Sequence, residues 1–217
     1  MPDEPAKESP AQKGEPAGSD WAAFYRSTIG REPRPLFAKG MAALEAAGVA
    51  PGQAIEIGFG DGRETLALLE AGWRVLAIDP EPAAAEVLQS QVPADVAGRL
   101  ETRSVQAEDA DVLPFDLLYA GYSLPFLDAD AFDRFWNAAR DRLRPGGILV
   151  VNFFGPHDSW AGREGMRFIG VDAVRRLVDG LELLALDEQD QDGESFLGPK
   201  HWHVFDVIAR RAPGPTG

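Results

Sequence analysis

A turn of three alternating glycines is the part of this sequence that most clearly serves chemistry. Gly58, Gly60 and Gly62 follow an apolar run, and a second apolar run further along the chain ends on Asp79. Glycines let the backbone approach a nucleoside closely, and an acid at the end of the next strand accepts hydrogen bonds from the ribose hydroxyls. The spacing therefore indicates a nucleoside-binding unit of strand, turn, helix and strand.

The acids around this turn indicate which nucleoside it binds. Dinucleotide sites space their glycines G-x-G-x-x-G and offer backbone amides at a helix N-terminus to a pyrophosphate. Here Glu56 precedes the first glycine, and Asp61 lies between the second and the third. Two carboxylates repel a pyrophosphate, but they suit a ligand that carries a sulfonium and an ammonium group. We therefore expect S-adenosylmethionine (SAM) to bind here.

Alternating strands and helices must position this turn. Two helices are expected near the N-terminus, one that begins near Asp20 and one over residues 36–47, and a longer one over residues 129–143. The apolar runs typical of strands lie at residues 54–57, 73–78, 100–105, 115–122 and 143–150. Such alternation predicts a parallel sheet with helices on both faces. The last two strands, over residues 181–186 and 204–209, are separated by a polar segment and predict an antiparallel hairpin.

Together these features resemble the class I SAM-dependent methyltransferases. Residues 56–62 are similar to the first motif of that family, Asp79 to its ribose-binding acid, and residues 143–150 to its turn into the fifth strand. The resemblance covers roughly residues 50–155 and is strongest to small bacterial enzymes of the tellurite-resistance and thiopurine type. It implies an α/β, Rossmann-like fold: a seven-stranded, mostly parallel sheet with helices on both faces and an antiparallel last strand.

The resemblance also implies which residues hold SAM. Asp79 takes the ribose, residues 107–109 frame the adenine, and the segment at Gly121 leaves room for the methionine portion. Tyr25 and Arg34 either close over the carboxylate end of the cofactor or serve only as packing and surface residues. The expected cofactor-binding residues are Glu56, Gly58, Phe59, Gly60, Asp61, Gly62, Asp79, Pro80, Ala107, Glu108, Asp109, Ala120, Gly121, Tyr25 and Arg34.

Three side chains are candidates for catalysis: Tyr122, His157 and His201. An imidazole has a pKa near neutrality and can take a proton from the methyl acceptor. Ligands bind beyond the carboxyl ends of parallel strands, so residues 200–203 and the loops 154–169 and 187–199 are expected around the acceptor. Nitrogen, oxygen and sulfur acceptors all stay open, because a soft acceptor needs no base.

A metal site is not expected. His201 and His203 would share one face of a strand, with Trp202 on the other, but no third ligand is evident.

Composition favours a single domain that acts on a small molecule. The chain has 217 residues, 45% of them hydrophobic, which suffices for one core over residues 20–211, with disordered tails at 1–19 and 212–217. It has no cysteine, no signal peptide core and no apolar run approaching the roughly 20 residues of a membrane span, so we expect a cytoplasmic protein without a membrane partner.

The charge of the chain narrows the choice of partner. The formal net charge of −14 disfavours nucleic acid, and a small-molecule acceptor and a monomer or homodimer are expected. Two alternatives remain. One is a non-catalytic SAM-binding sensor or partner subunit, and the other is an NAD(P)-dependent oxidoreductase.

Overall fold

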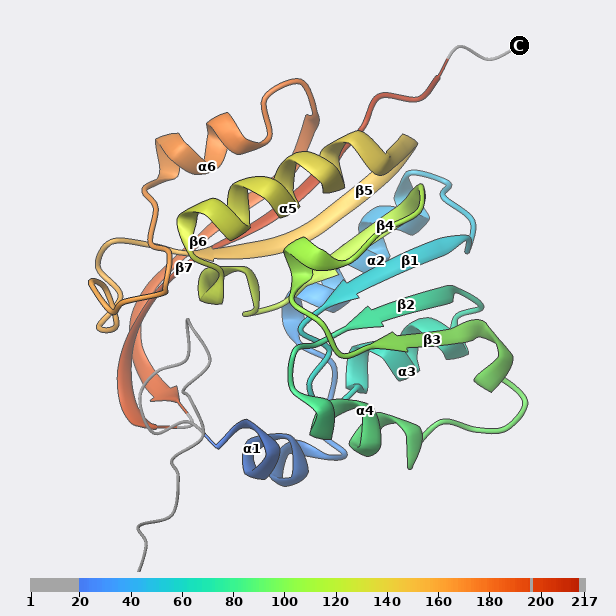
Figure 1. The fold of residues 1–217 in the computed structure, drawn as a ribbon. Coiled ribbons are helices and arrows are strands. Elements are labelled where there is room, and N and C mark those ends of the chain that lie inside the picture. The colour runs from blue at the N-terminus through green and yellow to red at the C-terminus, as the bar shows by residue number, and fades with distance from the viewer. Residues whose placement is uncertain (1–19, 196, 215–217) are drawn as a thin grey trace, which may run out of the picture.

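A mixed β-sheet runs through the centre of the molecule (Figure 1). The computed structural model describes residues 20–195 and 197–214, and within them seven strands lie in the order β3-β2-β1-β4-β5-β7-β6. The strands are β1 (Gln53–Ile57), β2 (Arg74–Ile78), β3 (Leu100–Arg103), β4 (Phe115–Ala120), β5 (Leu143–Phe154), β6 (Glu182–Ser195) and β7 (Gly198–Arg210). The first five strands are parallel, and β7 is antiparallel to both β5 and β6. The expected fold class is therefore confirmed.

Helices cover both faces of this sheet (Figure 1). They are α1 (Trp21–Thr28), α2 (Pro35–Ala46), α3 (Arg63–Glu70), α4 (Pro82–Gln89), α5 (Ala129–Arg142) and α6 (Val171–Leu177). The helices α5 and α6 pack on one face, and α2, α3 and α4 pack on the other. Figure 1 shows α1 apart from both layers, beside α4. No helix in the described part of the chain is long and apolar enough to span a membrane.

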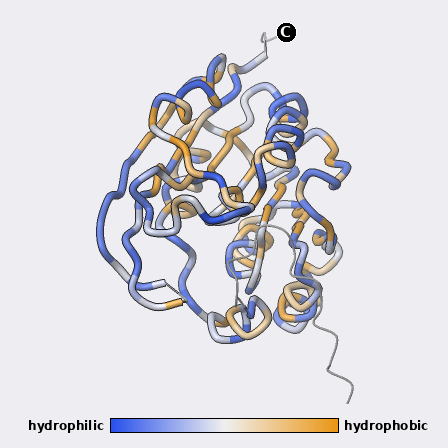
Figure 2. The backbone as a smooth tube through the Cα atoms, turned by 60° about the vertical axis from the view of Figure 1, so that its left-hand side comes forward, coloured by the Kyte–Doolittle hydropathy of each residue, from blue (hydrophilic) through white to orange (hydrophobic). Residues whose placement is uncertain are grey.

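The two cores follow from the alternation of side chains along the strands. In β1, Ile55 and Ile57 belong to the core beneath α5, whereas Ala54 belongs to the core beneath α3. Strands buried on both faces read as continuous apolar runs, which is why they are evident in the sequence. In Figure 2 the orange, hydrophobic segments accordingly gather in the interior of the molecule.

Three of the helices begin at acids that cap them, among them α4, where the side chain of Glu81 accepts a hydrogen bond from the backbone N–H of Ala83 at 3.1 Å. The side chain of Asp20 accepts a hydrogen bond from the backbone N–H of Ala23 at 2.8 Å, and Asp128 accepts one from Ala131 at 2.9 Å. Each cap satisfies an amide that the first turn of a helix leaves unpaired. The expected starts of α1 and α5 are confirmed.

The structure corrects one element. We expected residues 187–199 to be a loop, but β6 and β7 stay paired out to Ser195 and Gly198, so nearly all of that segment is strand. The paired segments 187–195 of β6 and 198–206 of β7, called the β6–β7 ribbon below, extend beyond the neighbouring strands. The ribbon is mostly hydrophilic, as the blue segments on the left of Figure 2 show. Its polar side chains are tolerated because they pair across the strands instead of packing in a core, for example Glu188 with His203 and Asp192 with His201.

The expected disordered tails are not described by the structure at residues 1–19 and 215–217.

Candidate functional site

A cavity of about 670 Å³ opens at the carboxyl ends of the parallel strands, where ligands of α/β sheets bind. Helix α1 and the β6–β7 ribbon border it, and it runs from the glycine turn to a group of aromatic side chains. The expected residues that line it are Glu56, Gly58, Phe59, Gly60, Asp61, Asp79, Pro80, Ala107, Gly121, Tyr25, Arg34 and Tyr122. The structure thus brings most of the expected cofactor-binding set to one place.

The glycine turn lets the backbone pass close to whatever occupies this cavity. Gly58, Gly60 and Gly62 have φ angles of 70°, 53° and 78°, in the left-handed region that side-chain-bearing residues rarely adopt. A Cβ atom on Gly60 would lie 3.0 Å from the ring of Tyr25. Residue 60 therefore needs glycine both for its conformation and for the space beneath α1.

Asp79 is held at the centre of the cavity wall. One of its carboxylate oxygens accepts a hydrogen bond from the backbone N–H of Gly60 at 3.0 Å, and the other accepts one from Glu81 at 2.9 Å. The hydroxyl of Tyr25 lies 3.4 Å from both oxygens. Burial raises the pKa of Asp79 to about 6, although the two amide hydrogen bonds act in the opposite direction. Asp79 is therefore a buried acceptor that ionises just below neutral pH.

An arginine that the sequence analysis missed organises the acids of the turn. Arg31 Nε lies 2.8 Å from Asp61, and its Nη1 lies 2.7 Å from Glu64. Burial opposes ionisation of Glu64, but the hydrogen bond from Arg31 and the charges of Arg31 and Arg34 together outweigh burial and lower the pKa of that carboxyl. Arg31 lies in the proline-rich break before α2, where nothing in the sequence links it to acids thirty residues away.

Glu56 differs from these two acids. Its carboxylate accepts a hydrogen bond from the hydroxyl of Thr65 at 2.5 Å. Burial, together with the nearby charge of Glu64, raises its pKa well above the usual range. The negative charge that lines this end of the cavity therefore comes mainly from Asp61, Glu64 and Asp79, opposed by Arg31 and Arg34.

Aromatic side chains line the other end of the cavity. Tyr122 makes edge-to-face contacts with Phe154 and Trp202, with centroids 6.1 and 5.6 Å apart, and Trp160 packs beside them. Tyr122 has a φ of 61°, the only positive value among the described residues other than glycine, and its N–H is held by Asn152 Oδ1 at 2.8 Å. Backbone strain of this kind persists where the surroundings fix it, and it often marks a functional position.

A carboxylate that the sequence analysis also missed, Asp206, lies at this aromatic end. Its side chain projects from β7 into the cavity lining and is only 4% exposed. One oxygen accepts a hydrogen bond from Gln189 Nε2 at 3.0 Å, whereas no partner of Oδ1 among the described residues has hydrogen-bond geometry. The amide of Asn152 faces Asp206 from β5 and acts to lower its pKa. Burial raises the pKa of Asp206. An acid on a late strand carried no recognisable signal, because only the β5–β7 pairing brings it here.

Four expected cofactor-binding residues do not belong to the described lining: Gly62, Ala120, Glu108 and Asp109. Gly62 begins α3, and Ala120 is fully buried in the core beneath α5. Glu108 turns away, and its carboxylate lies 3.5 Å from Arg134 of α5. A short 3₁₀ turn after β3 instead presents Gln106 and Ala107 to the cavity.

Two expected catalytic residues also lie elsewhere. His157 and His201 are on the side of the β6–β7 ribbon opposite Trp202, and neither is in the described lining of the cavity. Both rings pair with Asp190, at 2.9 and 2.6 Å. The alternation of side chains along β7 causes this placement, since Trp202 takes the cavity face. The geometry gives no support to the expectation that either imidazole acts as the base.

Lys200 lies near the mouth of the site but beneath its surface. Its ammonium is fully buried against the carboxylate of Asp158, 4.1 Å from the ring centroid of Trp202 and 4.5 Å from that of Trp160. Burial lowers the pKa of Lys200, while Asp158 opposes that shift. The pair fastens the loop after β5 to β7 and supports the aromatic wall from behind.

The chain matches one protein-family model in sequence and several solved structures in fold. Residues 55–149, which contain the glycine turn and Asp79, match a family described as a methyltransferase domain. No curated protein sequence matches the chain. Among solved structures, TehB of Haemophilus influenzae has a TM-score of 0.69 at 12% identity, over 88% of this chain and 67% of that one.

Two further solved structures were determined with product bound. NodS, an N-methyltransferase of Bradyrhizobium japonicum in complex with S-adenosylhomocysteine, has a TM-score of 0.64 at 16% identity, over 89% and 99% of the two chains. The 1,6-didemethyltoxoflavin N1-methyltransferase of Burkholderia thailandensis, with its substrate and S-adenosylhomocysteine, has a TM-score of 0.59 at 20% identity, over 88% and 87%. The TM-scores show that these proteins share the fold of this chain, and at identities this low the likeness shows the fold alone.

Proposed function

Because this chain is a class I SAM-dependent methyltransferase, we propose that it methylates an amine nitrogen of a small molecule with an apolar body. The observation that carries the proposal is the unpartnered carboxylate oxygen of Asp206 inside the aromatic end of the cavity. A carboxylate flanked by aromatic rings is the environment that an amine or ammonium group seeks.

The residues of the crevice fit SAM at its other end. Gly60 lets the backbone lie against the ring of Tyr25, where a Cβ atom would be crowded, and Asp79 presents buried acceptor oxygens beside it. The acids outnumber the arginines there, which suits a sulfonium and an ammonium group. Arg34 can supply a guanidinium group for the α-carboxylate of the methionine portion. The N–H groups of Arg31 are already donated to Asp61, Glu64 and the carbonyl of Glu32.

The size and continuity of the cavity support a small acceptor. Its volume of about 670 Å³ falls in the range of pockets for small ligands, and both the glycine turn and the aromatic end belong to it. Cofactor and acceptor would therefore meet within one continuous cavity. A strongly acidic chain also disfavours nucleic acid as the acceptor. The expectation of a monomer or homodimer stays a prediction.

The chain itself would contribute mainly position and proton acceptance. When bound, SAM would supply a methyl group that its positively charged sulfur activates for transfer to an acceptor lone pair, with S-adenosylhomocysteine as the leaving group. Tyr122, Phe154 and Trp202 orient the apolar body of the acceptor. Alignment of this kind can supply about 7–11 kcal/mol of the barrier.

Besides orienting the acceptor, Asp206 would act as a general base. An amine that carries a proton has no lone pair to offer, and a carboxylate with a raised pKa is a suitable base for that proton. The proton then passes from Asp206 to solvent through the open side of the cavity.

A methyl-transfer assay with Asp206→Asn tests this assignment. The wild-type chain should methylate members of a panel of apolar primary and secondary amines, detected by mass spectrometry, in preference to matched phenols and thiols. Asp206→Asn should lower kcat by about 10²–10⁴-fold and leave the affinity for S-adenosylhomocysteine unchanged. Asp95→Asn makes the same chemical change at an exposed acid outside the cavity and should change neither quantity.

Other outcomes would point to different functions. Preferred methylation of thiols, or full activity of Asp206→Asn, would contradict the amine assignment. Binding of SAM with no turnover on any member of the panel would favour the non-catalytic sensor.

A further inference from the structure

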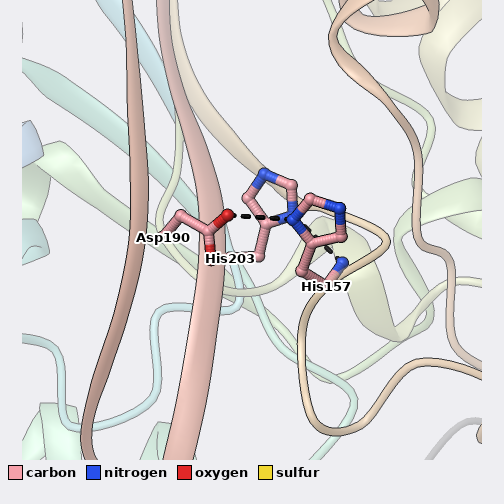
Figure 3. A group of neighbouring side chains, drawn as sticks. All are labelled: His157, Asp190 and His203. Carbon is pink, nitrogen blue, oxygen red and sulfur yellow. Dashed lines mark hydrogen bonds and ion pairs between the residues drawn. The ribbon is translucent and has the colours of Figure 1, made fainter.

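We propose that the β6–β7 ribbon carries a site for a divalent transition metal such as Zn²⁺, formed by His157, Asp190 and His203 on the side away from the cavity. The sequence contains three histidines, and all three gather on this face with Glu188, Asp190 and Asp192. Figure 3 shows the two imidazoles stacked beside the carboxylate of Asp190. Imidazole and carboxylate together are a common ligand set for zinc.

The spacing of the ligand atoms suits a single ion. One ligand atom from each of the three residues lies within 4.8 Å of the others. His157 Nδ1 and Asp190 Oδ2 are 2.9 Å apart, and the two rings stack at 4.6 Å with an interplanar angle of 20°. Zinc binds such atoms at about 2.0–2.2 Å, which places tetrahedral ligands roughly 3.3 Å apart. The side chains of His157 and Asp190 are 65% and 39% exposed and can rotate to close the difference.

Two of the three ligands already have outer partners of the kind that metal sites use. His203 Nε2 lies 2.9 Å from Glu188, which leaves its Nδ1 to face His157 and Asp190. Asp190 Oδ1 lies 2.6 Å from His201 Nε2. Ligating histidines commonly donate their second N–H to a carboxylate, and ligating carboxylates are themselves hydrogen-bonded. His201 has its other nitrogen 2.7 Å from Asp192, so it serves as a partner of Asp190 and not as a ligand.

The loop that carries His157 is held in place independently of the imidazoles. The N–H of Gly155 donates to the carbonyl of His203 at 2.6 Å, and that of Ser159 donates to His201 at 3.0 Å. The buried pair of Lys200 and Asp158 adds a third tie between loop and strand. Because the fold fixes both walls of the site, an ion need not organise them.

One existing contact must yield when the ion binds. His203 Nδ1 accepts a hydrogen bond from the backbone N–H of His157 at 3.1 Å, and the same lone pair would bind the metal. The N–H of His157 would then turn to solvent, which is feasible because the residue is exposed. Both histidines must bind as neutral imidazoles, so affinity should weaken as the pH is lowered.

Metal titration of the full chain after treatment with a chelator tests the proposal. Zn²⁺ followed by calorimetry, and Co²⁺ followed by its visible absorption, should saturate at one ion per chain. His157→Ala and Asp190→Asn should each weaken binding by more than about 100-fold. His201→Ala removes only an outer partner and should weaken it by about 10–100-fold.

The control matched to Asp190→Asn is Asp187, an acid on the same strand, β6, but on its other face. Asp187→Asn should leave metal affinity unchanged, since that side chain pairs with Lys39 of α2. S-adenosylhomocysteine titrations of the same proteins report folding and keep this test separate from the proposed methyl transfer. Binding that does not saturate at one equivalent, or that survives both His157→Ala and Asp190→Asn, would overturn the site. The cluster would then be a hydrogen-bond network that only fastens the loop to the ribbon.

Discussion

The protonation of Asp79 gives a quantitative test of the crevice. Burial raises the pKa of this carboxyl from 3.8 to about 6. One pKa unit corresponds to about 1.4 kcal/mol, so ionising Asp79 in the ligand-free fold costs about 3 kcal/mol more than ionising an exposed aspartate. Ribose hydroxyls donate most strongly to the ionised form, and binding should therefore require the proton to leave.

The affinity for S-adenosylhomocysteine should follow that ionisation. Near pH 7 most of the carboxyl is already ionised, whereas each pH unit below about 6 should lower the affinity by up to tenfold. At pH 5 it should be about tenfold weaker than at pH 7. Calorimetry between pH 5 and 7 measures this, because the amino and carboxyl groups of the ligand keep their charges in that window.

Asp79→Asn removes the titrating group and should abolish the part of the pH dependence of S-adenosylhomocysteine affinity that Asp79 causes. Affinity at pH 7 should fall by at least about 1.5 kcal/mol, because hydrogen bonds to a charged group are lost. Glu56 also has a raised pKa, but it is present in both proteins and cancels in the difference. Asp95→Asn, at an exposed acid outside the cavity, should behave as the wild type.

Stability gives the same test without ligand. A raised pKa in the fold means that stability is lost as the pH rises through about 6. Ligand-free Asp79→Asn should therefore exceed the wild type in free energy of unfolding at pH 7.5, by up to about 3 kcal/mol. Equal affinities in the two proteins, or a wild-type profile that is flat from pH 5 to 7, would refute the reasoning.

Two further predictions concern the turn. Gly60→Val should abolish S-adenosylhomocysteine binding while circular dichroism stays near wild type, because the new side chain meets the ring of Tyr25 at a φ of 53°; retained binding would count against the turn. Arg31→Ala should lower the free energy of unfolding in urea by up to about 3 kcal/mol, since it leaves Asp61 and Glu64 buried without their cation. A loss below about 0.5 kcal/mol would show that solvent replaces the guanidinium, which is 22% exposed.

The fold could be predicted from the sequence because its signals are local. Strands buried on both faces give continuous apolar runs, and acids such as Asp20 and Asp128 mark the starts of helices. The turn was recognisable for the same reason: its glycines and Asp79 stand at fixed spacings from apolar strands.

The β6–β7 ribbon shows where local signals fail. The polar composition of residues 187–199 predicts a loop, yet the pairing of β6 with β7 makes 187–195 and 198–199 strand. The interactions that decide this, such as that of Glu188 with His203, join positions on different strands.

The acceptor end was hardest to predict because tertiary pairing assembles it. Asp206 lies beside Asn152 only through the antiparallel register of β5 and β7, and Arg31 reaches Asp61 across a proline-rich break. The sequence predicts His157 and His201 near the acceptor, but they lie outside the described lining of the cavity, because the side of the ribbon on which they lie depends on one register. A shift of one residue in the register of β7 would turn Trp202 away from the cavity and turn the histidines of β7 toward it.

A crystal structure of the chain with S-adenosylhomocysteine tests the central claim most directly. Both ribose hydroxyls should lie within hydrogen-bond distance of Asp79, about 2.6–3.2 Å. The thioether sulfur should face the space between Tyr122 and Asp206. A ligand bound elsewhere, or a ribose turned away from Asp79, would contradict it.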